Sequence, residues 1–198
     1  MALRGKYRLS FTAGGLLLAE SLALAEKFLE IGDWDSVQVW AVETNLLQAR
    51  TLSSAKRICS ELITRLSRLS NTELTRLVAA HSDERRVWLW IAICRAYALI
   101  REFAVEVVRE RYLAGSRDPL TLADYQEFLE RKMVAGDELA KASSATRAKI
   151  RQKTFQLLQE VGLISKEKVV QGLALTDESM RSLPACDLEV FPIYVKGS

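Results

Sequence analysis

Apolar residues recur every three or four positions along most of this chain, which is the spacing of one buried face of an α-helix. In the first half, the pattern predicts helices over residues 15–31, 34–47, 55–69 and 72–80, and then one long helix from Asp83 to about Leu113. Gly32 is a natural C-cap, and Asp33 can cap the helix that follows it. The stretch from Val87 to Cys94 is so apolar that the long helix should form the buried centre of the fold.

Residues 114–119 (AGSRDP) are the best candidate for a linker, because glycine, serine and proline interrupt helices there. Beyond them, the pattern predicts a helix, a short helix, a basic helix and a strand-like segment, over residues 121–135, 137–142, 144–161 and 163–175. This is the order of a winged helix-turn-helix. We therefore predict a mostly α fold, with an N-terminal helical bundle (residues 1–115) and a C-terminal winged-helix domain (residues 119–198) that has a short β wing.

The most informative stretch runs from Ser143 to Lys168, where one amphipathic helix begins polar and basic and ends at Gly162. Seven Lys or Arg residues oppose two Glu residues between Lys141 and Lys168. The spacing predicts that four residues form its buried face: Ala148, Phe155, Leu158 and Val161. A helix that is anchored by its apolar half and presents a basic half suits a groove of nucleic acid.

A similar helix start occurs earlier in the chain. The sequence SSAKR opens the helix at residues 53–57, and SSATR opens the basic helix at residues 143–147. Arg50, Lys56 and Arg57 place a second group of cations near a helix N-terminus, where they oppose the helix dipole and therefore hint at an anionic ligand. We predict two helix-turn-helix-like modules, each of which presents a basic helix.

The candidate DNA-binding residues are cations or polar side chains on these two helices and in the segments that adjoin them. They are Arg50, Lys56, Arg57, Ser144, Arg147, Lys149, Arg151, Gln152, Lys153, Lys166 and Lys168. The lysines and arginines would neutralise phosphates. Gln152 is the best candidate for a contact with the edge of a base.

Catalysis has little support in the sequence. His81 is the only histidine, and no nucleophile motif, phosphate loop, dinucleotide fingerprint or metal-ligand cluster accompanies it. The three cysteines lie far apart without CxxC spacing, which indicates free thiols in a reducing compartment. We expect no enzyme, no cofactor, no metal and no small-molecule substrate.

The chain has 198 residues with a net charge of +3, and its charges gather in patches rather than covering the surface evenly. The N-terminus lacks the apolar core of a signal peptide. The longest apolar run, Val87 to Cys94, is far shorter than the ~20 residues of a membrane span. These features predict a cytoplasmic protein that does not use a membrane as a partner.

Three blocks of the sequence resemble the BrxA family, the small accessory component of BREX phage-resistance gene clusters. They are TAGGLL at residues 12–17 with Glu20 and Ser21, NLLQART at residues 45–51 with SSAKR after it, and TRAKIR at residues 146–151 with the GLI ending at 162–164. The resemblance implies a cytoplasmic, all-helical bacterial protein of helix-turn-helix character that binds double-stranded DNA. It also implies that the protein acts beside other BREX components, including a DNA methyltransferase and an ATPase.

Two alternatives stay open. The basic faces could dock acidic partner proteins, which would make the chain a helical scaffold in a defence complex. The chain could also be an RNA-binding helical bundle of the antitermination-factor kind. Salt-sensitive binding to duplex DNA, compared with binding to RNA of matched sequence, separates the three hypotheses.

Overall fold

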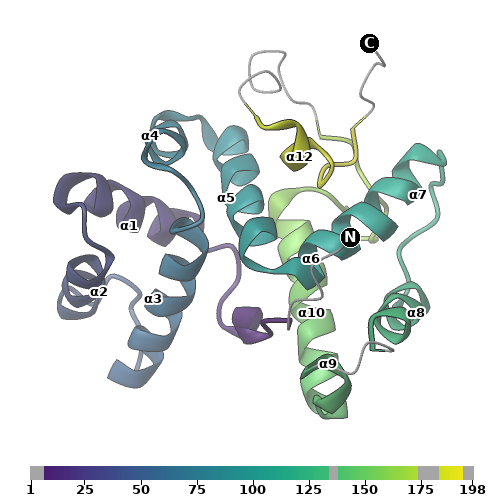
Figure 1. Ribbon diagram of the computed structural model, residues 1–198, viewed down its shortest axis with the longest axis horizontal. Coiled ribbons are helices and arrows are strands. Elements are labelled where there is room, and N and C mark those ends of the chain that lie inside the picture. The colour runs from purple at the N-terminus through teal and green to yellow at the C-terminus, as the bar shows by residue number, and fades with distance from the viewer. Residues whose placement is uncertain (1–6, 134–137, 174–182, 194–198) are drawn as a thin grey trace. The chain divides into compact units, whose positions relative to one another are not determined.

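The computed structural model describes residues 7–133, 138–173 and 183–193, and the regular structure in these ranges is helical (Figure 1). The mostly α class that the periodicity predicts is therefore confirmed. Two compact units are present: Ala13–Ala96, and Tyr97–Ser198 together with Met1–Thr12. The predicted domains, residues 1–115 and 119–198, stay a prediction, because compactness by itself does not show which segments fold independently.

Five α-helices build the unit of Ala13–Ala96: α1 (Leu18–Ile31), α2 (Trp34–Glu43), α3 (Leu52–Leu66), α4 (Asn71–Ala79) and α5 (Ser82–Ala96). The helix α1 packs on α2 and α4, and α3 packs on α2 and α5. The predicted caps are confirmed, since Gly32 ends α1 at φ 77° and the Asp33 carboxylate accepts the backbone N–H of Ser36 at 2.8 Å. The first helix starts later than expected, because Leu17 adopts a left-handed conformation (φ 49°) immediately before it.

The apolar run from Val87 to Cys94 is the buried centre of α5, as its composition predicts. All eight residues are buried, and Trp90, Ile91 and Ala92 have no exposed surface. Such a helix needs cover on every side, which explains why the apolar pattern loses its periodicity here. Among the residues that the structure describes, no helix is long and apolar enough to cross a membrane.

The prediction of one helix from Asp83 to Leu113 is wrong. The helix α5 ends at Ala96, and Tyr97 is extended (φ −131°) before α6 (Ala98–Phe103) begins. A π-helical segment, η2 (Ala104–Arg109), and α7 (Glu110–Leu113) follow without interruption. No glycine or proline marks the break. Its physical reason is tertiary, since the extended backbone buries the ring of Tyr97 completely, with its centroid 5.2 Å from that of Phe11.

The described residues of the second unit form α6, η2 and α7, the 3₁₀ turn η1 (Ser10–Thr12), and the helices α8 (Leu122–Met133), α9 (Glu138–Lys141), α10 (Ser144–Val161) and α12 (Ala185–Leu188). Aromatic rings form its core, with the Phe103 ring 4.9 Å from Tyr125 and 5.1 Å from Phe128. Arg101 on α6 holds the C-terminal segment, because its guanidinium donates to the carbonyl of Cys186 and lies 3.7 Å from the Asp187 carboxylate.

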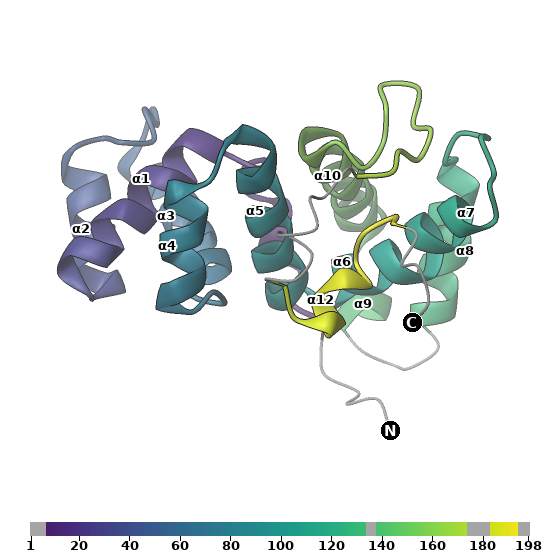
Figure 2. The same cartoon turned by 90° about the horizontal axis from the view of Figure 1, so that it is seen from above.

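The predicted β wing is not supported. The part of it that the structure describes, residues 163–173, is a projecting loop with one isolated antiparallel bridge, between Ile164 and Val170 (Figure 2). The Ser165 hydroxyl accepts the N–H groups of Glu167 and Val169, and Lys168 turns the chain at φ 66°. These local hydrogen bonds compete with a strand ladder and tighten the turn, so the segment forms no strands.

Candidate nucleic-acid interface

The helix α10 has the boundaries and the anchoring half that the sequence predicts. The Ser143 hydroxyl accepts the N–H of Thr146 at 3.1 Å, and Gly162 ends the helix at φ 92°. Phe155, Leu158 and Val161 are buried as expected. Ala148 is exposed, so its place in the predicted stripe is wrong. The buried face of the helix differs from the predicted one, because it also includes Ile150, Thr154 and Leu157.

The apolar half of α10 packs on α8. The Phe155 ring lies 5.9 Å from the ring of Tyr125, and the Tyr125 and Thr154 hydroxyls are 3.3 Å apart in the core. Burial raises the pKa of Tyr125 to about 12, so this phenol is neutral at every physiological pH. The joint fixes which face of α10 turns outward.

The outward face of α10 borders an open groove of about 900 Å³ within the second unit. The residues that line it are Leu122, Ala145, Ala148, Lys149, Arg151, Gln152, Phe155, Gln156, Gln159 and Lys168. Three of these side chains are cations, three are glutamines, and none is a carboxylate. We call this surface the α10 groove. Its charge favours an anionic ligand.

Lys168 reaches the α10 groove from the loop after the helix. Its carbonyl accepts the N–H of Leu120 at 2.9 Å, and its ammonium lies 5.6 Å from the centre of the Phe155 ring. A left-handed φ in a residue other than glycine is uncommon, and surrounding contacts must maintain it. The loop therefore holds one cation beside Lys149 and Arg151 instead of leaving it free in solvent.

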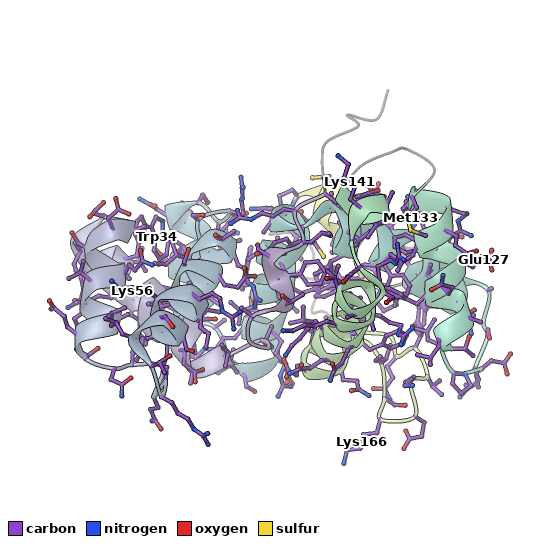
Figure 3. All side chains as sticks on the ribbon, turned by 90° about the horizontal axis from the view of Figure 1, so that it is seen from below. Trp34, Lys56, Glu127, Met133, Lys141 and Lys166 are labelled. Carbon is purple, nitrogen blue, oxygen red and sulfur yellow. The ribbon has the colours of Figure 1, made fainter. Side chains whose placement is uncertain are left out.

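The remaining candidates of this region lie outside the groove lining. Arg147 is half-buried and donates to the Met133 sulfur at 3.6 Å, and Lys153 donates to the Gln156 amide oxygen at 2.8 Å. Ser144 is exposed in the first turn of α10, while its neighbour Ser143 caps the helix. Lys166 stands on the projecting loop (Figure 3).

The second predicted basic surface belongs to the other unit. Arg50, Lys56 and Arg57 are all exposed, and the Thr51 hydroxyl caps α3 by accepting the N–H of Ser54 at 3.2 Å. Lys56 lines a groove of about 440 Å³ between α2 and α3, together with Gln38, Val39, Val42, Glu43 and Leu52. Unlike the α10 groove, this groove contains a carboxylate and an exposed apolar pair.

Sequence reasoning missed several residues of the α10 groove. Leu122 is 53% exposed at the start of α8, and nothing in the local pattern brings it near α10. Gln156 and Gln159 had a readable signal, since with Gln152 they follow the i, i+4, i+7 spacing of one helix face. The pattern did not reveal that Lys168 returns to this face.

Two observations concern metal-binding and nucleophilic groups. Among the residues that the structure describes, no group of three or more His, Cys, Asp or Glu side chains could hold a metal ion. Cys59 is buried, and burial raises the pKa of its thiol to about 11, so it is a poor nucleophile at neutral pH.

These features define an all-helical protein with a surface helix that borders a basic groove. The BrxA family model matches residues 5–185, so the chain belongs to the BrxA family. The chain is 26% identical over 172 residues to the "BREX protein BrxA" of Escherichia coli O9:H4 (strain HS), covering 86% of this chain and 80% of that protein. It is 27% identical over 128 residues to the "BREX protein BrxA" of Bacillus cereus (strain H3081.97), covering 65% of this chain and 64% of that protein.

A solved structure shares the fold. It is the crystal structure of an uncharacterized protein from Magnetospirillum magneticum, with a TM-score of 0.80 and 21% sequence identity. The match covers 96% of this chain and all of that chain.

Proposed function

We propose that this chain is a non-enzymatic DNA-binding component of a BREX phage-defence system in the bacterial cytoplasm. Family membership and relatives named as BREX proteins support the defence role. The observation that carries DNA binding is the α10 groove, where Lys149, Arg151 and Lys168 converge without a carboxylate in the lining.

The local chain order supports duplex DNA as the ligand. The short helix α9 ends at Lys141 and α10 starts at Ser144, and a connection this short is compatible with the turn of a helix-turn-helix. In this motif the second helix enters the major groove with its N-terminal half. The projecting loop after α10 would take the place of a wing, and Lys166 on it would contact phosphate.

The second basic surface would add contacts. Arg50, Lys56 and Arg57 lie at or near the start of α3, which follows α2 after a turn of eight residues, Thr44 to Thr51. Their exposure leaves them available to phosphates. Binding through both units would raise the overall affinity, because the second contact is intramolecular.

One observation favours protein docking as an additional role of this surface. Val39 and Leu52 are 56% and 60% exposed beside Lys56 in the α2–α3 groove, and contiguous apolar patches with a polar rim mark protein interfaces. Another BREX component is the partner that family membership suggests.

Fluorescence anisotropy with a labelled duplex over a series of salt concentrations tests the proposal. We expect affinity to fall steeply with salt, with a slope of log affinity against log salt of about −0.9 for each phosphate contacted. The double change Lys149→Ala with Lys168→Ala should reduce the magnitude of that slope by about two. The double change Arg147→Ala with Lys153→Ala measures how much of the salt slope comes from these two candidates, which lie outside the groove lining.

The matched control is Arg86→Ala with Arg131→Ala, which removes the same charge at two side chains that are 41% and 52% exposed and line neither groove. It should leave the slope almost unchanged. Absence of duplex binding at low salt would refute DNA binding, and tighter binding to RNA of matched sequence would favour the RNA alternative. An unchanged slope in a folded Lys149→Ala, Lys168→Ala variant would exclude the α10 groove as the binding surface.

A further inference from the structure

Three glutamines border the α10 groove, and within the described residues only one of them has a side-chain amide without a hydrogen bond. Gln156 accepts from the Lys153 ammonium at 2.8 Å and donates to the Glu160 carboxylate at 2.7 Å. Gln159 donates to the carbonyl of Ser165 at 3.3 Å and so supports the loop. Gln152 is exposed, and its amide makes no hydrogen bond within the described part of the chain.

The surroundings of Gln152 allow a close approach. One turn before it, Ala148 is exposed and presents only a methyl group to the groove, with Lys149 beside it. Ala145 continues this low surface toward the helix N-terminus. Short side chains at these positions let the helix backbone come near the floor of a major groove, so that the longer Gln152 side chain reaches a base edge.

The chemistry of this arrangement distinguishes between base pairs. A glutamine amide presents one acceptor and one donor side by side, which matches the N6 amino group and the N7 atom of adenine. Guanine offers two acceptors at the corresponding edge, so one end of the amide would stay unpaired there. The methyl group of Ala148 suits the C5-methyl group of thymine. The surrounding cations favour phosphate and contribute no preference of this kind.

We propose that the outer face of α10 reads A·T pairs in the major groove, with the Gln152 amide on adenine and the Ala148 methyl on thymine. This inference rests on the proposed DNA binding and adds a sequence preference to it. Gln152 is the specificity-determining residue, and Lys149, Arg151 and Lys168 hold the duplex in register through its phosphates. A good bidentate contact should give a preference of about tenfold or more over the wrong base.

Competition binding with three duplexes of equal length tests the inference. One is rich in A·T pairs, one is rich in G·C pairs, and the third replaces every adenine of the first with 7-deazaadenine. The analogue removes the N7 acceptor while it leaves base pairing and the minor-groove edge intact. We expect the A·T duplex to bind about tenfold more tightly than the other two.

Two variants make the test specific. Gln152→Ala should lose the preference for the A·T duplex and its sensitivity to 7-deazaadenine, while it keeps the affinity for the G·C duplex and the salt slope. Gln126→Ala on α8 is the control, because it removes an exposed glutamine that lines neither groove and whose amide donates to the Glu130 carboxylate at 2.9 Å. This control should keep the preference.

The failure of the inference differs from the failure of the proposed function. If the protein binds all three duplexes equally, or if Gln152→Ala keeps the preference, base reading by Gln152 is wrong while DNA binding stands. If an A·T preference is insensitive to 7-deazaadenine, the protein reads groove shape instead, and the inference is also wrong. If no duplex binds at low salt, the proposed function itself fails.

Discussion

Breaking the buried ion pair between Glu61 and Arg65 on α3 should strongly destabilise the unit that carries the second basic surface. The two side chains are 4% and 3% exposed. The Arg65 guanidinium donates to the Glu61 carboxylate at 3.1 Å, to the carbonyl of Gly15 at 2.7 Å and to that of Ala13 at 3.4 Å. It therefore ties the segment before α1 to α3.

The expected effects follow from the cost of leaving a buried charge alone. Glu61→Ala removes the counter-charge of a guanidinium that is almost fully buried, which should cost about 3–5 kcal/mol. The double change Glu61→Leu with Arg65→Met replaces the pair by apolar groups. It leaves the carbonyls of Gly15 and Ala13 without their donor, at about 1–2 kcal/mol each. The double variant should therefore be no less stable than Glu61→Ala.

Equilibrium urea unfolding, followed by far-UV circular dichroism, measures these differences. The control is Glu30→Ala, which breaks the Lys27–Glu30 pair on α1, where the carboxylate side chain is 63% exposed, and should cost less than about 0.5 kcal/mol. A cost of Glu61→Ala as small as that of the control would refute the reasoning. So would additive effects of Glu61→Leu and Arg65→Met measured separately and together.

Two further predictions concern stability. Ile91→Ala should lower the free energy of unfolding in urea by about 3–5 kcal/mol, because Ile91 is completely buried in α5. Val39→Ala, at a 56% exposed position, should lower it little. Equal effects of the two changes would show that α5 is not the core. The bidentate hydrogen bonds from Arg95, at 2.7 and 2.9 Å, lower the pKa of Glu73 to about 2. Because the folded-state pKa is depressed, this stabilisation is present at neutral pH and is lost as the pH falls from about 4.5 toward 2. After allowance for solvent screening it amounts to about 1–2 kcal/mol. Between about pH 6 and pH 3, the free energy of unfolding of the wild type should lose the larger part of this contribution, and that of Glu73→Gln should not. Parallel curves of unfolding free energy against pH would contradict the assignment.

The sequence by itself determined the helical class and most helix boundaries, because these depend on local patterns. Apolar spacing of three and four residues, Asp33 and Ser143 as N-caps, and Gly32 and Gly162 as C-caps act within a few residues of chain. The buried half of α10 was also readable, because a helix that is apolar on one side must bury that side.

Tertiary contacts decided the rest. Arg65 belongs to a basic stretch of sequence, yet it is buried because Glu61 and two backbone carbonyls satisfy its guanidinium. Tyr97 breaks a continuous helical pattern because its ring packs on Phe11, more than 80 residues earlier in the chain.

The α10 groove is likewise a product of the tertiary structure. Lys168 and Leu122 border it because a left-handed turn and a hydrogen bond from Leu120 bring the loop back to the helix. Gln152, Gln156 and Gln159 lie on one face of α10. Hydrogen bonds of the folded chain engage the amides of Gln156 and Gln159, whereas the amide of Gln152 makes none within the described residues. Local spacing specifies which face a residue occupies, whereas partners distant in sequence decide whether its charge is buried, paired or available.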